Sequence, residues 1–225
     1  MFRMILWKEW KENLWKLIFC GGVSAVFTIM LYRTRLLTDE ANCRLVSLIQ
    51  MFIVPIVYSL DIFAGEMSSR TIYLLFKIPI PRWKIFFSKY IVCAAGIISV
   101  FLTSSFVMEI MSHGREMPYL YLLKMNMLFC AAALILFTWF CPFGCQSRSE
   151  AGSLTAMFSV FIGWGIVMFW AQLCEVAWAI ILIPYSLMFI SFTKLSYIIA
   201  FLQVIVIAVL LAVACYRYVS IRRYL

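Results

Sequence analysis

Long apolar stretches alternate with short polar segments along most of this chain. Because an α-helix rises about 1.5 Å per residue, about 20 apolar residues cross a bilayer core about 30 Å thick. Six stretches approach this length and predict transmembrane helices in an all-α, polytopic membrane protein. They lie near residues 17–32, 45–63, 90–111, 121–143, 154–172 and 195–216.

Residues 2–16 predict an amphipathic helix before the first span. Helical spacing gathers apolar residues on one side: Leu6, Trp7, Trp10 and Leu14. It gathers charged residues on the other: Lys8, Glu9, Glu12 and Lys16. Tryptophan on one side and lysine on the other suit a helix that lies flat at the membrane surface. We expect this interfacial helix; the alternative is a helical extension of the first span into water.

Residues 176–192 are apolar but contain Pro184, so they either cross the membrane or enter and return. With a cytoplasmic amino terminus and no crossing here, 13 of the 19 lysines and arginines lie inside and 6 outside. If the segment crosses, the division is 11 to 8. Cytoplasmic regions collect basic residues. The count favours a re-entrant hairpin with both termini cytoplasmic, packed against the spans because irregular backbone cannot face lipid.

Composition supports a membrane environment. Apolar residues make up 65% of the 225 residues and charged residues 13%, and the mean hydropathy is +1.00. Soluble domains carry about 45–50% apolar and about 25% charged residues. We therefore expect residues 1–225 to form a single transmembrane domain. The net charge of +9 lies at the ends of apolar runs, which indicates orientation in the membrane rather than nucleic-acid binding.

Residues 65–89 form the longest polar connection and carry the clearest functional pattern. Three apolar residues can share one face of a short helix there: Ile72, Leu75 and Phe76. Pro79 and Pro81 then break that helix, and a second helix is expected from near Arg82 into the third span. A short cytoplasmic helix held at a set angle between two spans could receive a push from a partner protein.

This segment resembles the permease subunits of ABC type-2 transporters. Those proteins carry an acidic residue, Gly-Thr, a leucine-rich turn, Pro-Val-Ser-Arg and, at the foot of the third span, Gly-Lys. The matching residues are Glu66, Thr71, Leu74, Leu75, Pro79, Ile80, Pro81, Arg82 and Lys89. The offsets of Thr71, Pro79, Arg82 and Lys89 from Glu66 agree with the family without gaps. Ser68, Arg70 and Ser88 depart from the pattern, standing where an acid, a glycine and a glycine are usual.

The resemblance implies a dimer of six-helix permeases, identical or homologous, above two ATPase subunits. ATP and Mg²⁺ would bind the ATPase chains, and this chain would hold no cofactor. The helix after Glu66 would be the coupling helix, docked in a groove of the ATPase. Most members with this layout are exporters, so we expect a multi-pass protein of a bacterial cell membrane that exports a peptide, drug or lipid-like molecule.

The residues do not predict an enzyme or a metal site. No Gly-Lys pair is present, which excludes a P-loop. The single histidine, His113, excludes an HExxH motif, and the two aspartates, Asp39 and Asp61, cannot form a buried catalytic pair within spans. Cys141 and Cys145 have a spacing that can hold a metal, but packing is expected because no further ligands lie nearby.

Several further residues are candidates with open alternatives. Asp61 is either a gate, a partner for a basic residue of the coupling segment, or a hydrated headgroup-level carboxylate. Small residues form two stripes, for contact with a second permease or for packing within one chain: Gly21 and Ala25, and Gly152, Ala156, Ser159 and Gly163. Four aromatic residues either line an apolar substrate path or pack: Phe161, Trp164, Phe169 and Trp170. Cys43 and Cys174, both expected outside, could form a disulfide.

Two other functions remain open. A secondary carrier driven by an ion gradient usually places ionisable groups or broken helices at the membrane midplane within repeats, and neither repeats nor midplane charges are evident here. A scaffold or sensor subunit would bind an ATPase without transporting anything. The sequence does not indicate the substrate.

Overall fold

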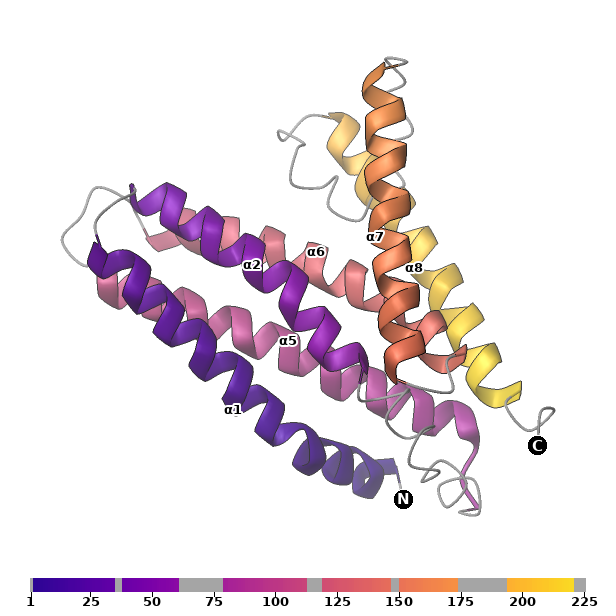
Figure 1. The fold of residues 1–225 in the computed structure, drawn as a ribbon. Helices are drawn as coiled ribbons and strands as arrows, with labels where there is room; N and C mark the ends of the chain where they lie inside the picture. Colours follow the sequence, from indigo (N-terminus) through magenta and orange to yellow (C-terminus); the bar gives the residue numbers. More distant parts are fainter. Residues whose placement is uncertain are drawn as a thin grey trace. The chain divides into compact units, whose positions relative to one another are not determined.

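A computed structural model describes residues 2–34, 38–60, 79–112, 119–146, 150–173 and 194–220. Six helices account for almost all of them, and these ranges contain no strand (Figure 1). The helices are α1 (Phe2–Thr34), α2 (Asp39–Ser59), α5 (Arg82–Ser112), α6 (Tyr119–Gln146), α7 (Glu150–Leu173) and α8 (Lys194–Ser220). The predicted all-α class is therefore confirmed for the described part of the chain.

Among the described residues, five helices are long and apolar enough to cross a membrane: α1, α2, α5, α6 and α8. They cover five of the six predicted spans, the second of them (45–63) as far as Ser59. Helix α7 covers the remaining one, but its described apolar stretch, Ala151–Trp164, is shorter. These long apolar helices are compatible with the predicted multi-pass membrane protein. The exact number of six spans stays a prediction, and the re-entrant segment 176–192 and the short coupling helix lie outside the described residues.

Helix α1 differs from the prediction in two ways. Residues 2–16 and the first span form one continuous helix of 33 residues rather than a separate surface helix and a span. Two of the four residues expected to face water, Glu9 and Lys16, are also buried, whereas Lys8 and Glu12 are exposed. The buried residues recur every three or four positions and are mostly polar or small: Glu9, Asn13, Lys16, Cys20, Gly21, Ser24, Thr28 and Tyr32.

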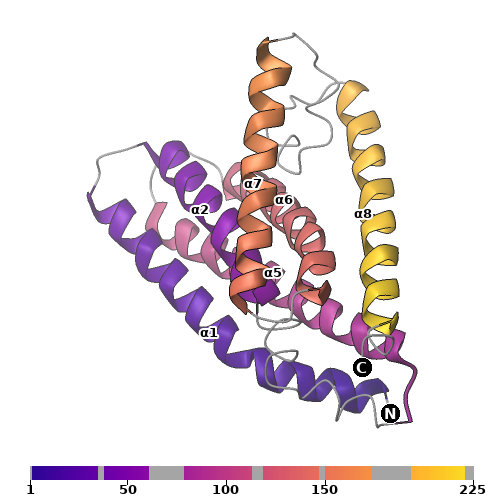
Figure 2. The same cartoon turned by 45° about the vertical axis from the view of Figure 1, so that its right-hand side comes forward.

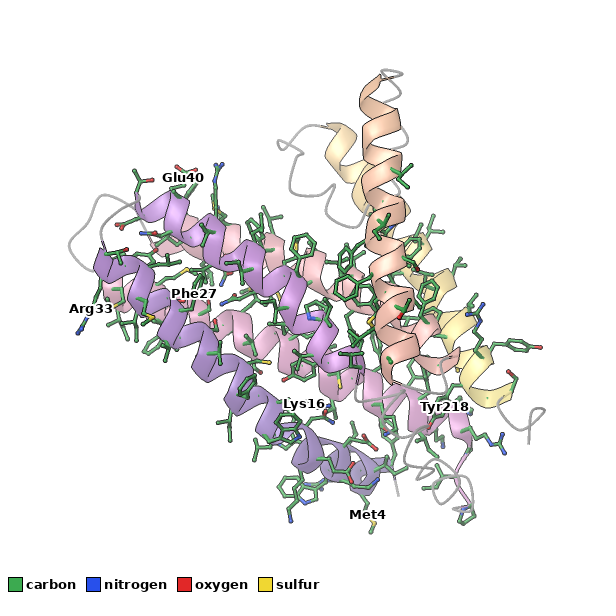
Figure 3. All side chains as sticks on the ribbon, viewed as in Figure 1. Met4, Lys16, Phe27, Arg33, Glu40 and Tyr218 are labelled. Atoms are coloured by element: carbon green, nitrogen blue, oxygen red, sulfur yellow. The ribbon has the colours of Figure 1, made fainter. Side chains whose placement is uncertain are left out.

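The opposite, exposed face of α1 is largely apolar, while its first turns also expose Arg3, Lys8, Lys11 and Glu12. Its residues include Met4, Trp7, Trp15, Ile18, Val23, Val26 and Met30. In Figure 3, Lys16 lies on the inner side of α1, whereas Met4 points away from the other helices. From Leu14 to Met30 the outer face of α1 carries no exposed charge, which fits surroundings of lipid because lipid-exposed charge is costly.

The chain divides into two compact units. Unit 1 comprises Met1–Tyr58 and Ser88–Leu134, and unit 2 comprises Ser59–Phe87 and Ile135–Leu225. In unit 1, α1, α2 and most of α5 lie side by side in both views (Figures 1 and 2). Unit 1 contains a buried apolar cluster: Tyr32, Cys43, Val46, Met108 and Leu122.

Unit 2 contains the first turns of α5, the second half of α6, α7 and α8. Its described interior is rich in aromatic rings from α5, α6, α7 and α8: Phe86, Trp139, Phe140, Phe161, Trp164 and Tyr218. Arg217 on α8 donates a hydrogen bond of 3.4 Å to the carbonyl of Pro142 on α6.

Candidate functional site

Helix α5 begins where the sequence predicts, directly after the two prolines of the candidate coupling segment. Arg82 is its first residue, and the Lys84 amide donates to the Pro81 carbonyl at 2.9 Å. Proline has no amide hydrogen and cannot continue a helix from upstream, so Pro79 and Pro81 fix this start. The other residues assigned to coupling or gating lie outside the described part of the chain: Asp61, Glu66, Thr71, Leu74 and Leu75.

The first turn of α5 is bound to the last turn of α8, within unit 2. The guanidinium of Arg82 donates to the carbonyl of Val219 at 2.9 Å. The last carbonyls of a helix have no intrahelical partner and carry partial negative charge, so a cation there is favourable. The rings of Phe86 and Tyr218, both fully buried, lie next to each other with centroids 5.8 Å apart.

A buried ion pair lies two turns further along α5, within unit 1. The ammonium of Lys89 lies 2.9 Å from both carboxylate oxygens of Glu9 on α1, and both side chains are only 2% exposed. Removing two charges from water is costly and is offset only by close, well-directed contact. The pair is therefore a strong constraint on how α1 packs against α5. Lys89, predicted to act in coupling, thus has a partner inside its own chain.

Two further polar residues of α1 extend this ion pair into a buried polar cluster, which we define as Glu9, Asn13, Lys16 and Lys89. The Asn13 amide donates to the Glu9 carbonyl at 2.8 Å, and the Lys16 ammonium donates to the Asn13 side-chain oxygen at 2.7 Å. The cluster contains one carboxylate and two ammonium groups, a formal charge of +1. Buried ionisable groups in a membrane protein are candidate functional residues.

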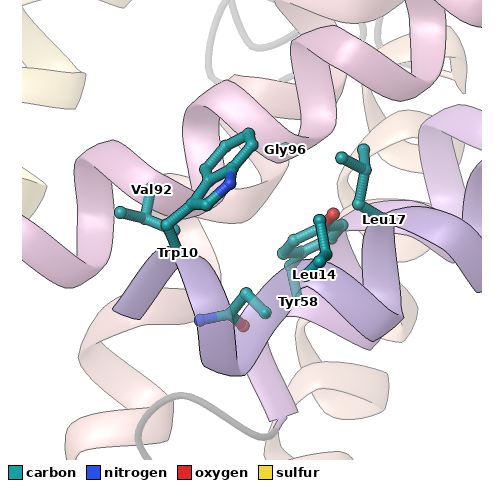
Figure 4. A pocket seen from close by; sticks show the side chains of 7 residues that line it. Trp10, Leu14, Leu17, Tyr58, Val92 and Gly96 are labelled. Atoms are coloured by element: carbon teal, nitrogen blue, oxygen red, sulfur yellow. The ribbon is translucent and has the colours of Figure 1, made fainter. Parts of the chain in front are cut away.

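A cavity of about 10 Å³ adjoins this cluster between α1, α2 and α5 (Figure 4). Its lining includes Trp10 and Asn13 from α1, Tyr58 from α2 and Gly96 from α5. The Tyr58 hydroxyl is buried and has no hydrogen-bond partner among the described residues. This volume approaches the minimum that holds one water molecule. The α2–α5 approach is close, because a Cβ on Gly96 would lie 2.5 Å from the Tyr58 hydroxyl oxygen.

A second polar network joins α2, α5 and α6 inside unit 1. The Ser47 hydroxyl donates to the Asn126 side-chain oxygen at 2.7 Å. The Asn126 amide donates to the Phe101 carbonyl at 2.8 Å and to the Ser105 hydroxyl at 2.6 Å. Gln50 on α2 also donates to Ser24 on α1. Such hydrogen bonds hold helices together in lipid, where no hydrophobic force favours helix over lipid contact.

Two residues of the predicted substrate path belong to an aromatic cluster of α6 and α7. Phe161 lies with its ring centroid 5.4 Å from Phe140 and 5.6 Å from Trp164, and Trp164 lies 5.4 Å from Trp139. All three pairs are edge-to-face, a favourable geometry for aromatic rings. The other two residues, Phe169 and Trp170, lie on α7, but their side chains are outside the description.

The predicted stripes of small residues fall on two helices in different units. Gly21 and Ala25 lie on α1; Gly152, Ala156, Ser159 and Gly163 lie on α7. A Cβ added to Gly21 or Gly163 would meet no atom within 4 Å. Within the described part of the chain, a larger residue could therefore replace either glycine without colliding with a neighbouring helix.

Cysteines and metal ligands add no site among the described residues. Cys43, Cys141 and Cys145 are buried thiols, and Cys174 is not described. Within the described ranges, no three His, Cys, Asp or Glu side chains come together in a way that could hold a metal ion.

Comparison with protein-family models gives no match, and comparison with curated protein sequences gives none either.

Sequence reasoning did not predict the two buried polar groups of unit 1. Asn126 and Gln50 are isolated polar residues inside apolar stretches, which is a signal for helix–helix hydrogen bonding. Glu9, Asn13 and Lys16 follow a spacing of four and three residues that continues into Cys20, Ser24 and Thr28. This spacing continues without a break across the boundary predicted between the surface helix and the first span. It therefore indicates a single helix with one side that faces the protein interior.

Proposed function

We propose that this chain is the permease subunit of an ATP-driven transporter of the ABC type-2 class, and that its ATPase is a separate chain. It moves a peptide, drug or lipid-like substrate outward across a bacterial cell membrane. Both termini are cytoplasmic, and six spans per chain assemble with a second permease. The pattern of residues from Glu66 to Lys89 supports this proposal.

The observation that carries the proposal is the anchored start of α5, which follows that pattern directly in the sequence. Pro79 and Pro81 lead directly into the helix, Arg82 is bound to the end of α8, and Lys89 is bound to α1. A displacement of the segment before Pro79 would therefore be passed to α5 rather than absorbed by a loose helix start. A permease driven by a separate ATPase requires this mechanical property at its cytoplasmic face.

Reconstitution of the chain with its partner ATPase tests the proposal. Glu66→Ala, and separately Pro79→Ala combined with Pro81→Ala, should retain ATP hydrolysis and lose most ATP-dependent transport. Matched controls in the loop expected on the outer side, Glu116→Ala and Pro118→Ala, should transport normally. Normal coupling of ATP hydrolysis to transport in the Glu66 and double proline variants would overturn the assignment of the coupling segment.

A secondary carrier is the second candidate, and the buried polar cluster is the observation that favours it. Glu9, Lys16 and Lys89 are ionisable and buried, as are the ion-coupling groups of many carriers. Transport that persists in vesicles without ATP, while an ion gradient is kept, would support the carrier. Transport that stops without ATP supports the ATP-driven permease, and ATPase binding without any flux would indicate a scaffold subunit.

A further inference from the structure

Unit 1 carries a groove of about 520 Å³ between the start of α1 and the third and fourth turns of α5. Six apolar residues line it: Leu6, Trp7, Trp10, Ile91, Val92 and Ala95. Trp7 is 69% exposed and Ile91 47% exposed, so the groove faces the surroundings rather than the interior. Its volume falls within the range of sites that bind small molecules, which is about 300–1,000 Å³.

Arg3 is the one charged residue among those that line this groove. Its side chain is exposed, and it lies on the first turn of α1. A guanidinium presents donors in a planar arrangement that matches phosphate oxygens. The groove thus combines a long apolar wall with a single phosphate-binding group, which is the chemistry of a phospholipid.

The surrounding residues place the groove near the boundary between headgroups and acyl chains. The exposed Lys8–Glu12 ion pair, with a distance of 3.3 Å, lies on the same turns of α1 as Trp7. Trp7 itself is exposed, and the basic residues Arg3 and Lys8 lie within about one turn of it on α1. Tryptophan and basic residues gather at membrane–water interfaces. At this depth, a phospholipid can present both its headgroup phosphate and an acyl chain to the groove.

A second groove of unit 1 provides the comparison. It has about the same volume, 510 Å³, and runs along α1 further from the amino terminus. All of its lining residues are apolar or glycine: Ile18, Phe19, Gly22, Val23, Val26, Phe27 and Met30. Acyl chains can cover this surface, but nothing in its lining distinguishes one headgroup from another.

We propose that the groove beside Arg3 is a binding site for an anionic phospholipid. One acyl chain lies along Trp7, Trp10 and Ile91, and the headgroup phosphate binds the Arg3 guanidinium. The net negative charge of the lipid matters because Arg3 is not neutralised by any other residue of the groove lining. This site does not depend on transport or on an ATPase, so it can be tested whether or not the permease proposal holds.

The test uses the full chain in vesicles of phosphatidylcholine that contain a small fraction of photoreactive phospholipid, with the reactive group on the acyl chain. The probe carries either a phosphatidylglycerol or a phosphatidylcholine headgroup, and mass spectrometry locates the labelled peptides. Labelling of residues 6–10 and 91–95 should be about fivefold higher with the anionic probe, given the contribution of one basic residue near a membrane. Labelling of residues 18–30 should be equal for the two probes.

Two variants and one control complete the experiment. Arg3→Gln should reduce anionic labelling of the groove to the phosphatidylcholine level, while Arg33→Gln, at the other exposed end of α1, should leave it unchanged. Ala95→Phe should reduce labelling by both probes because it fills the groove. Equal labelling of the groove by the two probes, or labelling that is unchanged in Arg3→Gln or in Ala95→Phe, would overturn the proposal.

Discussion

The two units hold their helices together with different chemistry. The interior of unit 1 contains the Glu9–Lys89 ion pair and the Asn126 network, whereas the described interior of unit 2 contains interlocking aromatic rings such as Phe161 and Trp164. All of these helices are apolar enough for a membrane, or nearly so. The difference therefore concerns the contacts between helices rather than the helices themselves.

In lipid this difference has energetic consequences. Apolar side chains gain little by leaving lipid for a protein interior, so specific contacts must supply helix association. Polar contacts in unit 1 are directional, and loss of one partner leaves a buried group unsatisfied. Aromatic contacts in unit 2 are less directional, and loss of one ring leaves an apolar surface that neighbours or lipid can cover. Substitutions should therefore be more harmful in unit 1.

The largest effect is expected for Lys89→Met. This change leaves the Glu9 carboxylate buried without the ammonium, which should lower the free energy of unfolding by about 3 kcal/mol or more. Unfolding of the purified protein in detergent, followed by circular dichroism, measures the loss. The combined change Glu9→Leu and Lys89→Met should recover most of the stability, because it removes both charges.

Lys8→Met is the matched control for that experiment. Lys8 forms an exposed ion pair with Glu12 at 3.3 Å, and exposed pairs contribute about 0–1 kcal/mol. A loss for Lys89→Met no greater than that for Lys8→Met would show that the buried ion pair does not stabilise unit 1.

Gly96→Ala should have the next largest effect. The new Cβ would lie within 2.7 Å of three atoms of the Tyr58 ring and hydroxyl, so the ring or the helix must shift at a cost of about 1–3 kcal/mol. Gly22→Ala, on an exposed face of α1 with open space around it, should be neutral or stabilise the helix by up to about 1 kcal/mol. Similar melting temperatures for the two variants would argue against the close α2–α5 contact.

Asn126→Leu tests the second polar network. It removes the hydrogen bonds to Ser47, Ser105 and the Phe101 carbonyl. Each such bond contributes about 0.6 kcal/mol on average in membrane proteins, so loss of the three should cost about 1.8 kcal/mol. Thr155→Ala removes only a bond between an exposed hydroxyl and the carbonyl of Ala151 in its own helix, and should cost less than about 0.5 kcal/mol. A neutral Asn126→Leu would mean that packing alone holds α2, α5 and α6.

Local rules predicted the helices well. The apolar lengths predicted the class, and the two prolines predicted the start of α5 at Arg82, because proline blocks helix continuation whatever the tertiary context. Cys141 and Cys145 are buried, as expected for small apolar side chains. Each of these features depends on residues close together in the sequence, which is why the sequence alone was sufficient.

The inner face of α1 could not be assigned in this way. Periodicity shows which residues share a side of a helix but not what that side contacts. The rule for surface helices places Glu9 and Lys16 in water; in a membrane bundle the polar side can instead face inward when a partner is present. That partner, Lys89, lies 80 residues away in the sequence, and only the tertiary structure brings it to Glu9.

The smallest effect is expected for Phe161→Leu in unit 2, and it also addresses the open role of the aromatic cluster. Leucine keeps an apolar side chain but loses the edge-to-face contacts with Phe140 and Trp164, so the expected loss is about 1 kcal/mol. Phe158→Leu, at an exposed position on the same helix, should change stability very little.

If the cluster only packs, Phe161→Leu should lower the melting temperature while the substrate concentration for half-maximal transport stays unchanged. If it lines a substrate path, that concentration should change in Phe161→Leu and not in Phe158→Leu. A loss of stability as large as that of Lys89→Met would contradict the contrast between the two units, since a ring replaced by an apolar side chain should not cost as much as an unpaired buried charge.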